Sequence, residues 1–261
     1  MLRPDELLAR YDREMRIDPA PEPGVRVERL DRLVRLLGDD NYVIYSDLTR
    51  EDAPRVVAEQ AEFFRRSGAA LEWKTFGHDR PPTLGATLAA AGFVPGELET
   101  LVVLDLERTV PTGARAAGVE VRQMTDRAGA REAARTHEAV HGPDDSPRSA
   151  RWEEWVSDPR VGLFVAYVDG RPVALGRISM PEGRSFAGLW GGGTAPAYRH
   201  RGVYRSLVAA RATLARQRGY RFLTVDALET SRPILERLGF VPLTTTRGWV
   251  LRPGTGLGTP R

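Results

Sequence analysis

The chain has 261 residues, of which 41% are apolar and 28% charged, and it contains no cysteine. This composition is typical of a globular protein with one large domain or two small ones. The absence of cysteine excludes disulfides, thiolate metal sites and a cysteine nucleophile, and fits a reducing compartment. The net charge of +3 gives little support to general nucleic-acid binding, so we expect no nucleic-acid partner.

Apolar runs are short throughout. The longest, Val161–Val168, is far shorter than a membrane-spanning helix requires. The N-terminal sequence MLRPDELLARYDREM is charged and lacks the apolar core of a secretory signal. We therefore expect a cytoplasmic protein with no membrane partner.

The first half of the chain is predicted to alternate helices and strands. An amphipathic helix over 5–16 ends at a proline-rich segment. Residues 25–37 fit a strand or a helix, because the valines alternate whereas the leucines are spaced along a helix face. Further along, the pattern predicts strands over 42–48, 71–76 and 100–106 and helices over 54–66 and 84–91.

Residues 107–118 (ERTVPTGARAAG) are typical of a linker, and the pattern restarts after them. Asp169-Gly170 indicates a tight hairpin between two apolar strands. A loop is expected over 141–149. The remaining predictions are strands over 119–122, 162–168, 172–180, 185–194, 222–227 and 249–251, and helices over 130–140, 152–156, 202–218 and 232–238.

The two halves share a weak repeat. Residues 88–95 (LAAAGFVP) resemble 235–242 (LERLGFVP), and residues 61–68 resemble 212–219. In both copies the predicted order is helix, glycine, strand, helix, Gly-Phe-Val-Pro and strand. We interpret this as a duplication. The predicted organisation is a module over 1–106, a linker over 107–118, a second module over 119–252 and a mobile tail over 253–261.

The most informative segment is Gly191–Leu207, where a strand leads through a basic, glycine-containing turn into a helix. The first turn of a helix has free N–H groups and a positive dipole end, which together bind anions, diphosphates above all. From Arg199 to Arg221 there are seven arginines and no carboxylate. The alternative is a turn before a surface helix with solvated arginines. Its apolar face is predicted to be Val203, Leu207, Ala210 and Leu214, with the arginines on the other faces.

Residues 194–202 (TAPAYRHRG) closely resemble the acetyl-CoA-binding motif of the GNAT superfamily of N-acetyltransferases. Residues 234–240 (ILERLGF) resemble the closing helix-to-strand signature of that family. The resemblance extends from Val119 to about Arg252. It implies an α/β (α+β) fold of two GNAT-like mixed β-sheet modules. It also implies transfer of an acetyl group from acetyl-CoA to the amine of a small molecule in a ternary complex.

The resemblance also assigns residues. The strand edge should pair with the pantetheine amides, the helix amides and arginines should hold the pyrophosphate, and the strands over 185–194 and 222–227 should splay apart. The cofactor-binding residues it implies are Gly192, Gly193, Thr194, Arg199, His200, Arg201, Gly202, Val203, Tyr204 and Arg205.

Three positions depart from the family pattern, Tyr204, Thr194 and Leu235, of which Thr194 replaces the usual Val, a minor change if only its backbone is used. Tyr204 stands where the family has Gly or Ala, and crowds the phosphates unless its ring points away. Leu235 replaces a Tyr that protonates the leaving thiolate in many members. The strand over 185–194 holds no carboxylate to act as a base, so the catalytic candidates are Asp226 and Glu229 at the end of the next strand. The alternative is that Asp226 is a helix cap and Glu229 a solvated loop charge.

Other groups are weaker candidates. His141 is expected in the loop beside the acceptor, although a loop histidine is commonly just solvated. Asp144, Asp145, Glu153 and Glu154 would make an acidic mouth for a cationic amine, or simply a solvated face. Trp152, Trp155 and Trp190 would line a pocket or the core. No His, Asp or Glu spacing suggests a metal site, and we expect a monomer or homodimer.

The first half is interpreted as degenerate. Its segment aligned with the phosphate loop, 48–53 (LTREDA), has no glycine and carries two carboxylates, which would repel a diphosphate. Two alternatives to a small-molecule acetyltransferase stay open. One is a CoA-binding sensor of the same fold with little catalysis, and the other is a protein or peptide N-acetyltransferase.

Overall fold

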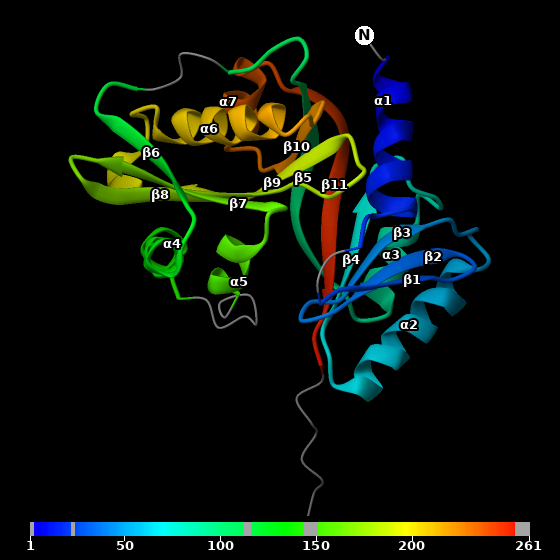
Figure 1. Ribbon diagram of the computed structural model, residues 1–261. Helices are drawn as coiled ribbons and strands as arrows, with labels where there is room; N and C mark the ends of the chain where they lie inside the picture. Colours follow the sequence, from blue (N-terminus) through cyan, green and yellow to red (C-terminus); the bar gives the residue numbers. More distant parts are fainter. Residues whose placement is uncertain (1–2, 22–23, 112–115, 144–150, 254–261) are drawn as a thin grey trace, which may run out of the picture. The chain divides into compact units, whose positions relative to one another are not determined.

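The computed structural model describes residues 3–21, 24–111, 116–143 and 151–253. The chain forms two compact units (Figure 1). Unit 1 comprises residues 1–101 together with 243–261, and unit 2 comprises residues 102–242. The division falls inside two strands, β5 (Val94–Asp105) and β11 (Val241–Leu251). The predicted α/β fold is confirmed, because each unit has a mixed sheet flanked by helices.

Unit 1 is a sheet in the order β1-β2-β3-β4-β11-β5. Strand β3 pairs in parallel with β4, whereas β1/β2, β2/β3 and β4/β11 are antiparallel. Its other elements are α1 (Pro4–Tyr11), the π-helix η1 (Asp12–Ile17), β1 (Arg26–Arg29), β2 (Leu33–Leu37), β3 (Tyr42–Ser46), α2 (Ala53–Ser67), β4 (Leu71–Phe76) and α3 (Leu84–Ala90).

The faces of unit 1 follow from the alternation of side chains along β4. Trp73 is fully buried in a core cluster with α2 and α3. Phe76, of opposite parity, faces η1, where the Arg16 guanidinium lies 3.7 Å from its ring centroid. Helix α2 ends at Gly68, whose φ of +67° gives the left-handed turn that glycine adopts without strain. The two helices and η1 therefore cover opposite faces of the sheet.

Unit 2 has the order β5-β10-β9-β8-β7-β6, with β5 represented by residues 102–105. Strands β6 to β9 are antiparallel and β9/β10 is parallel. Helices α6 and α7 cover one face of this sheet, and α4 and α5 the other (Figure 1). The elements are β6 (Val119–Met124), α4 (Arg127–His141), α5 (Trp152–Ser157), β7 (Val161–Val168), β8 (Arg171–Ser179), β9 (Phe186–Thr194), the 3₁₀ turn η3 (Pro196–Tyr198), α6 (Val203–Gln217), β10 (Phe222–Ala227) and α7 (Arg232–Arg237).

The two units repeat one order of elements, as the sequence repeat predicts. In unit 1 the order β3-α2-β4-α3 leads to β5, and in unit 2 the order β9-α6-β10-α7 leads to β11. The last strands are exchanged, because β11 pairs with β4 while the end of β5 lies beside β10. The predicted ranges 1–106 and 119–252 therefore differ from the compact units at these strands. Local periodicity shows that a strand forms but not which sheet it joins.

Two further expectations need adjustment. The ambiguous segment 25–37 forms the antiparallel strands β1 and β2, with the partly exposed Leu30 in the turn between them. Strands β5 and β11 begin much earlier than predicted, directly after each Gly-Phe pair, at mostly exposed residues that lack apolar alternation.

In the described part of the chain, no helix is both long and apolar enough to cross a membrane.

Candidate active site

The centre of the site is a β-bulge at Gly191–Gly192 in β9. The β8/β9 ladder pairs Leu175 with Gly193 and Arg177 with Trp190, which leaves two residues of β9 opposite Gly176 alone. Gly191 has a φ of +56°, in the left-handed region that favours glycine. The backbone of Gly191 and Gly192 is exposed. The glycine run therefore turns the strand and leaves its backbone accessible.

Beside the bulge, β9 and β10 part. Their parallel ladder covers Phe222 to Thr224 of β10, opposite Phe186 to Gly188 of β9, and ends there. Beyond Gly188, the edge of β9 that faces away from β8 lies outside this ladder. Unpaired strand edges carry N–H and C=O groups that can add an extended ligand. The expected splay of these two strands is thus present.

The loop after β9, where the anion site was predicted, has a backbone suited to bind an anion. His200 and Gly202 have positive φ values of 63° and 77°, and Gly202 is the N-cap of α6. The first-turn amides of α6, from Val203 to Arg205, have no intrahelical acceptor. Successive amides in such a turn form a concave anion-binding nest.

The arginines of this loop add positive charge. Arg199, Arg201 and Arg205 are exposed, and none of them forms an ion pair with a described carboxylate. Arg199 Nε donates to the Thr194 carbonyl at 3.2 Å, which holds the loop against the end of β9. A Cβ at Gly202 would lie 2.8 Å from Ala116 Cβ, so only glycine fits there. The free amides and unpaired arginines are the donor set that a diphosphate needs, and they fit the pyrophosphate of CoA.

Tyr204 points away from the loop. Its ring would come within 3.2 Å of a Cβ on Gly192, so it lies under the bulge on the α6 face. Burial raises the pKa of this Tyr204 phenol. The crowding expected from Tyr204 therefore does not arise, since the ring packs against the core and leaves its backbone amide in the helix turn.

His141 lies against the bulge from the opposite, α4 face. A Cβ on Gly193 would be 2.5 Å from His141 Cε1 and 2.6 Å from Nε2, so the imidazole occupies the space that a side chain would fill. Burial lowers the pKa of His141, the nearby His137 lowers it further, and a hydrogen bond to the Gly191 backbone opposes both. The histidine is the last residue of α4, not part of the predicted loop.

A series of aromatic contacts extends from His141 on this face. The His137 ring centroid lies 4.8 Å from that of His141 and 5.4 Å from that of Trp152, and the two rings Trp152 and Trp155 are 5.1 Å apart. The Trp190 side chain is 47% exposed. This face of the bulge is therefore rich in aromatic groups suited to the apolar part of a substrate.

The two residues predicted as bases lie on β10 and directly after it. Asp226 is on β10, beyond the last residue paired with β9. Glu229 follows that strand, is 90% exposed and forms an ion pair with Arg232 at 3.4 Å. Leu235, at the position of the missing acid, is fully buried in the core of unit 2.

The predicted acidic mouth is only partly described. Asp144 and Asp145 lie outside the described residues. Glu153 pairs with Arg127 at 3.1 Å, and Glu154 pairs with Arg151 at 3.1 Å. The two described carboxylates are thus neutralised by neighbouring arginines.

Sequence analysis missed Arg211 of α6. The helix was expected to bury Val203, Leu207, Ala210 and Leu214. Val203 and Leu207 are buried, Ala210 and Leu214 are only partly buried, and Arg211 is 1% exposed. The arginines of this helix were expected in solvent, but Arg211 lies on the face that packs against the sheet. The sequence signal that could have indicated a buried Arg211 is a pair of glycines, Gly176 and Gly192. Their missing side chains leave room for a large group on the opposite helix.

The start of α2 in unit 1 contrasts with that of α6. Thr49 closes it, because its carbonyl accepts from the Ala53 amide at 3.1 Å and its hydroxyl accepts from the Asp52 amide at 3.1 Å. The Asp52 carboxylate and the exposed Glu51 are also there, and the hydrogen bond from Thr49 lowers the pKa of Asp52. Negative charge and satisfied amides do not suit a diphosphate.

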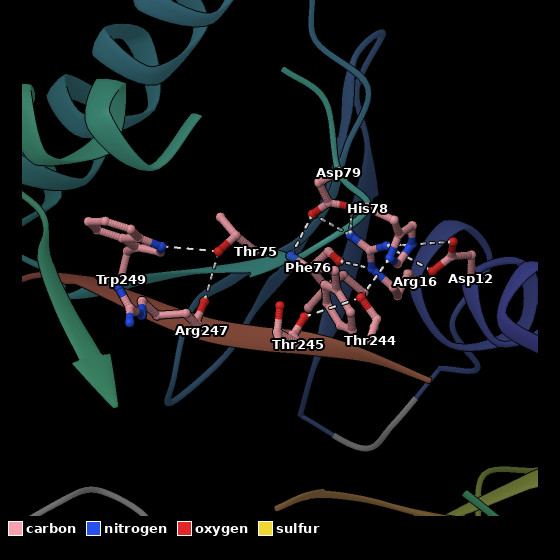
Figure 2. A network of polar contacts seen from close by, with 11 residues as sticks. Asp12, Arg16, Thr75, Phe76, His78, Asp79, Thr244, Thr245, Arg247 and Trp249 are labelled. Carbon is pink, nitrogen blue, oxygen red and sulfur yellow. Dashed lines mark hydrogen bonds and ion pairs between the residues drawn. The ribbon is translucent and has the colours of Figure 1, made fainter. Parts of the chain in front are cut away.

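A second polar cluster lies in unit 1, around the sequence His78-Asp79 (Figure 2). Arg16 is 2% exposed and donates to both oxygens of Asp79, at 2.7 and 2.8 Å, and to Asp12 at 2.8 Å. His78 Nε2 lies 2.8 Å from Asp12, and its Nδ1 lies 3.3 Å from the Thr244 hydroxyl of β11. Each guanidinium nitrogen has a partner, so this network joins η1, β4 and β11 and has the character of a structural ion cluster.

Residues 129–240 match the model of the Acetyltransferase (GNAT) family. No curated protein sequence matches the chain significantly. Similar solved structures are a GCN5-related N-acetyltransferase from Kribbella flavida (18% identity, 99% of this chain and 97% of that one, TM-score 0.67), a functionally unknown conserved protein from Staphylococcus epidermidis (14%, 93% and 98%, 0.65) and a tandem GNAT protein from the clavulanic acid biosynthesis pathway (18%, 91% and 86%, 0.57).

These likenesses confirm the tandem GNAT fold. The match to this family model supports acyl-CoA-dependent acyl transfer in general. Among the described residues, no group of three or more His, Asp or Glu side chains could hold a metal ion.

Proposed function

We propose that unit 2 is an N-acetyltransferase that moves an acetyl group from acetyl-CoA to the amine of a small molecule. The observation that carries this proposal is the bulge at Gly191–Gly192, with an anion site at one end of its strand and a neutral histidine on one face. A cytoplasmic monomer or homodimer is part of the proposal, and the absence of cysteine favours a reducing compartment.

The donor would be held by backbone groups. The amides from Val203 to Arg205, with His200 and Gly202 shaping the loop, would bind the pyrophosphate, and Arg199, Arg201 and Arg205 would neutralise it. The strand edge from Gly192 to Thr194 would pair with the pantetheine amides. When bound, acetyl-CoA would supply an activated acyl group, which residues at the splay between β9 and β10 would hold.

His141 is our proposed general base. An acceptor amine is protonated at neutral pH, with a pKa of about 10.4 for an alkylammonium group, and must lose a proton before attack. The pKa of His141 is lowered by burial, so the imidazole is neutral at pH 7. Because one ring nitrogen is hydrogen-bonded to the Gly191 backbone, the other can accept the proton.

Asp226 and Glu229 remain second candidates for the base. The ion pair and exposure of Glu229 favour a solvated role for it. The comparison that separates the candidates uses His141→Gln, Asp226→Asn and Glu229→Gln, each measured for kcat/KM with the same amine. Loss of about 10²-fold or more in one variant alone identifies the base. An equal, small effect in all three would contradict a side-chain base at these positions.

A CoA-binding sensor is the second candidate function. The buried Leu235 at the acid position and the lack of a carboxylate on β9 favour it. Protein or peptide acetylation remains a third reading, with a larger acceptor on the aromatic face.

The first experiment measures binding and turnover separately. Acetyl-CoA is expected to raise Tm because it binds the folded state, and Gly202→Asp is expected to abolish that shift. Free thiol is then measured with a panel of small amines and with peptides. A Tm shift without thiol release from any acceptor favours the sensor. No Tm shift and no saturable binding would refute the proposed donor site.

A further inference from the structure

Arg211 is buried under the bulge with an unused donor. Its Nε donates to the Leu207 carbonyl at 3.1 Å, and its Nη1 donates to the Arg177 carbonyl at 3.2 Å. Nη2 is buried and has no hydrogen-bond partner among the described residues. A buried N–H without a partner is costly, so such groups are commonly completed by water, an ion or a ligand.

The charge of Arg211 is also unbalanced. Burial lowers the pKa of its guanidinium to about 10, and among the described residues the Tyr204 phenol alone opposes this shift. The two other buried arginines in the described part of the chain are each paired with carboxylates. Arg16 binds Asp12 and Asp79, and Arg35 binds Glu28 at 2.6 Å. A buried charge without a counter-ion is strongly unfavourable. Arg211 differs from Arg16 and Arg35 because no described carboxylate balances its buried charge.

The fold brings this guanidinium close to the reacting strand. A Cβ on Gly176 would lie 2.6 Å from Nη1, and a Cβ on Gly192 would lie 3.3 Å from Nη2. Both glycines therefore make room for Arg211, and Gly192 is itself exposed on the other side. Because the β9/β10 ladder ends at Gly188, Nη2 lies beneath the part of β9 that leaves β10.

We propose that Arg211 binds the carboxylate of a substrate at the splay, through the free Nη2 donor. The carboxylate belongs either to the acyl group of the CoA thioester, as in a dicarboxylic acyl chain, or to an amino-acid acceptor. In both cases a charge-assisted hydrogen bond satisfies the donor and supplies the missing negative charge. Tyr204, whose ring lies against Gly192 beside the guanidinium, forms a wall of this subsite. The inference rests on the proposed function, since the ligand is either the acyl donor or the amine acceptor of that reaction.

The test compares the whole protein with Arg211→Met. Methionine keeps the length of the side chain and removes the buried charge, a change that is often neutral or stabilising. Arg216→Met, at an exposed position of the same helix, is the matched control. Unchanged circular dichroism and Tm establish that the variants fold, and Arg211→Lys serves as a second variant that keeps a positive charge.

The first arm titrates CoA, acetyl-CoA and succinyl-CoA by calorimetry. The second arm uses acetyl-CoA and compares kcat/KM for α-amino acids and their amides. We expect a preference of about tenfold or more for the carboxylate in one arm, which identifies its source. Arg211→Met should remove that preference, while Arg216→Met keeps it and acetyl-CoA still binds.

The outcomes separate the two proposals. Binding of acetyl-CoA with no carboxylate preference in either arm, or a preference that survives in Arg211→Met, overturns the role of Arg211 and leaves the acetyltransferase proposal intact. No binding of any CoA species overturns the proposed function, and this subsite with it.

Discussion

A single methyl group on Gly193 tests the position of His141. In Gly193→Ala the new Cβ would lie 2.5 Å from His141 Cε1, 2.6 Å from Nε2 and 2.6 Å from Val140 Cγ1. Such contacts are about 1 Å shorter than van der Waals distance, so the imidazole must move away from the bulge by about that much. The backbone of β9 stays in place, because Gly193 is paired with Leu175 and has no positive φ value.

The size of the effect follows from this displacement. A shift of about 1 Å in a reacting group costs about 10²-fold in rate, which corresponds to about 2.7 kcal/mol in activation free energy. We therefore expect Gly193→Ala to lower kcat/KM about 10²-fold with a small amine. The dissociation constant for acetyl-CoA should stay nearly unchanged, because the phosphate loop is not touched.

The assay is a double-mutant cycle of Gly193→Ala and His141→Gln, read as thiol release under steady-state conditions. If the alanine acts through the imidazole, it has little further effect once His141 is replaced. The reasoning is refuted if Gly193→Ala leaves kcat/KM unchanged, or if it lowers kcat/KM by the same factor in the presence and absence of His141.

Three more predictions concern pH, the loop and stability. Since burial lowers the pKa of His141, kcat/KM should stay high until the pH falls below 6.5 and then decrease as the base becomes protonated; a midpoint above 6.5 would contradict this assignment. Gly202→Ala should weaken acetyl-CoA binding measured by calorimetry, because the φ of Gly202 is +77° and the new Cβ would lie 2.8 Å from Ala116 Cβ. An unaltered affinity would contradict the role of this loop in binding acetyl-CoA. Asp79→Asn should lower the free energy of unfolding, measured by urea denaturation, by ~3–5 kcal/mol, because it leaves Arg16 buried without its bidentate partner. Arg16→Met combined with Asp79→Asn should recover part of that loss.

Much of the fold could be read from periodicity and glycine. Strand β4 has the predicted bounds, and α2 ends at Gly68 as expected. These elements have strong local signals: alternating apolar residues in one case and a left-handed glycine in the other. The exchange of β5 and β11 had no such signal, because the choice between two similar sheets depends on contacts far apart in sequence.

The candidate site was likewise only partly predictable from the sequence. The loop from Arg199 to Gly202 was predictable because its chemistry lies in consecutive residues. The sequence predicts His141 only as a weak candidate in a loop beside the acceptor, with a solvated residue as the alternative. The fold alone brings the end of α4 against Gly193. Arg211 was missed because an arginine in a basic helix ordinarily lies in water. Two glycines on neighbouring strands that face one helix would have been the clue.

The strand exchange has a consequence for biosynthesis. As the ribosome synthesises the chain, the N-terminal sheet must wait for residues 243–251 before β4 gains its antiparallel neighbour and Trp249 and Leu251 complete its core. Until then, the nascent polypeptide exposes a sheet edge that is open to misassembly. Separate expression of the two halves, divided at 107–118, should therefore give poorly folded fragments that regain structure only when mixed.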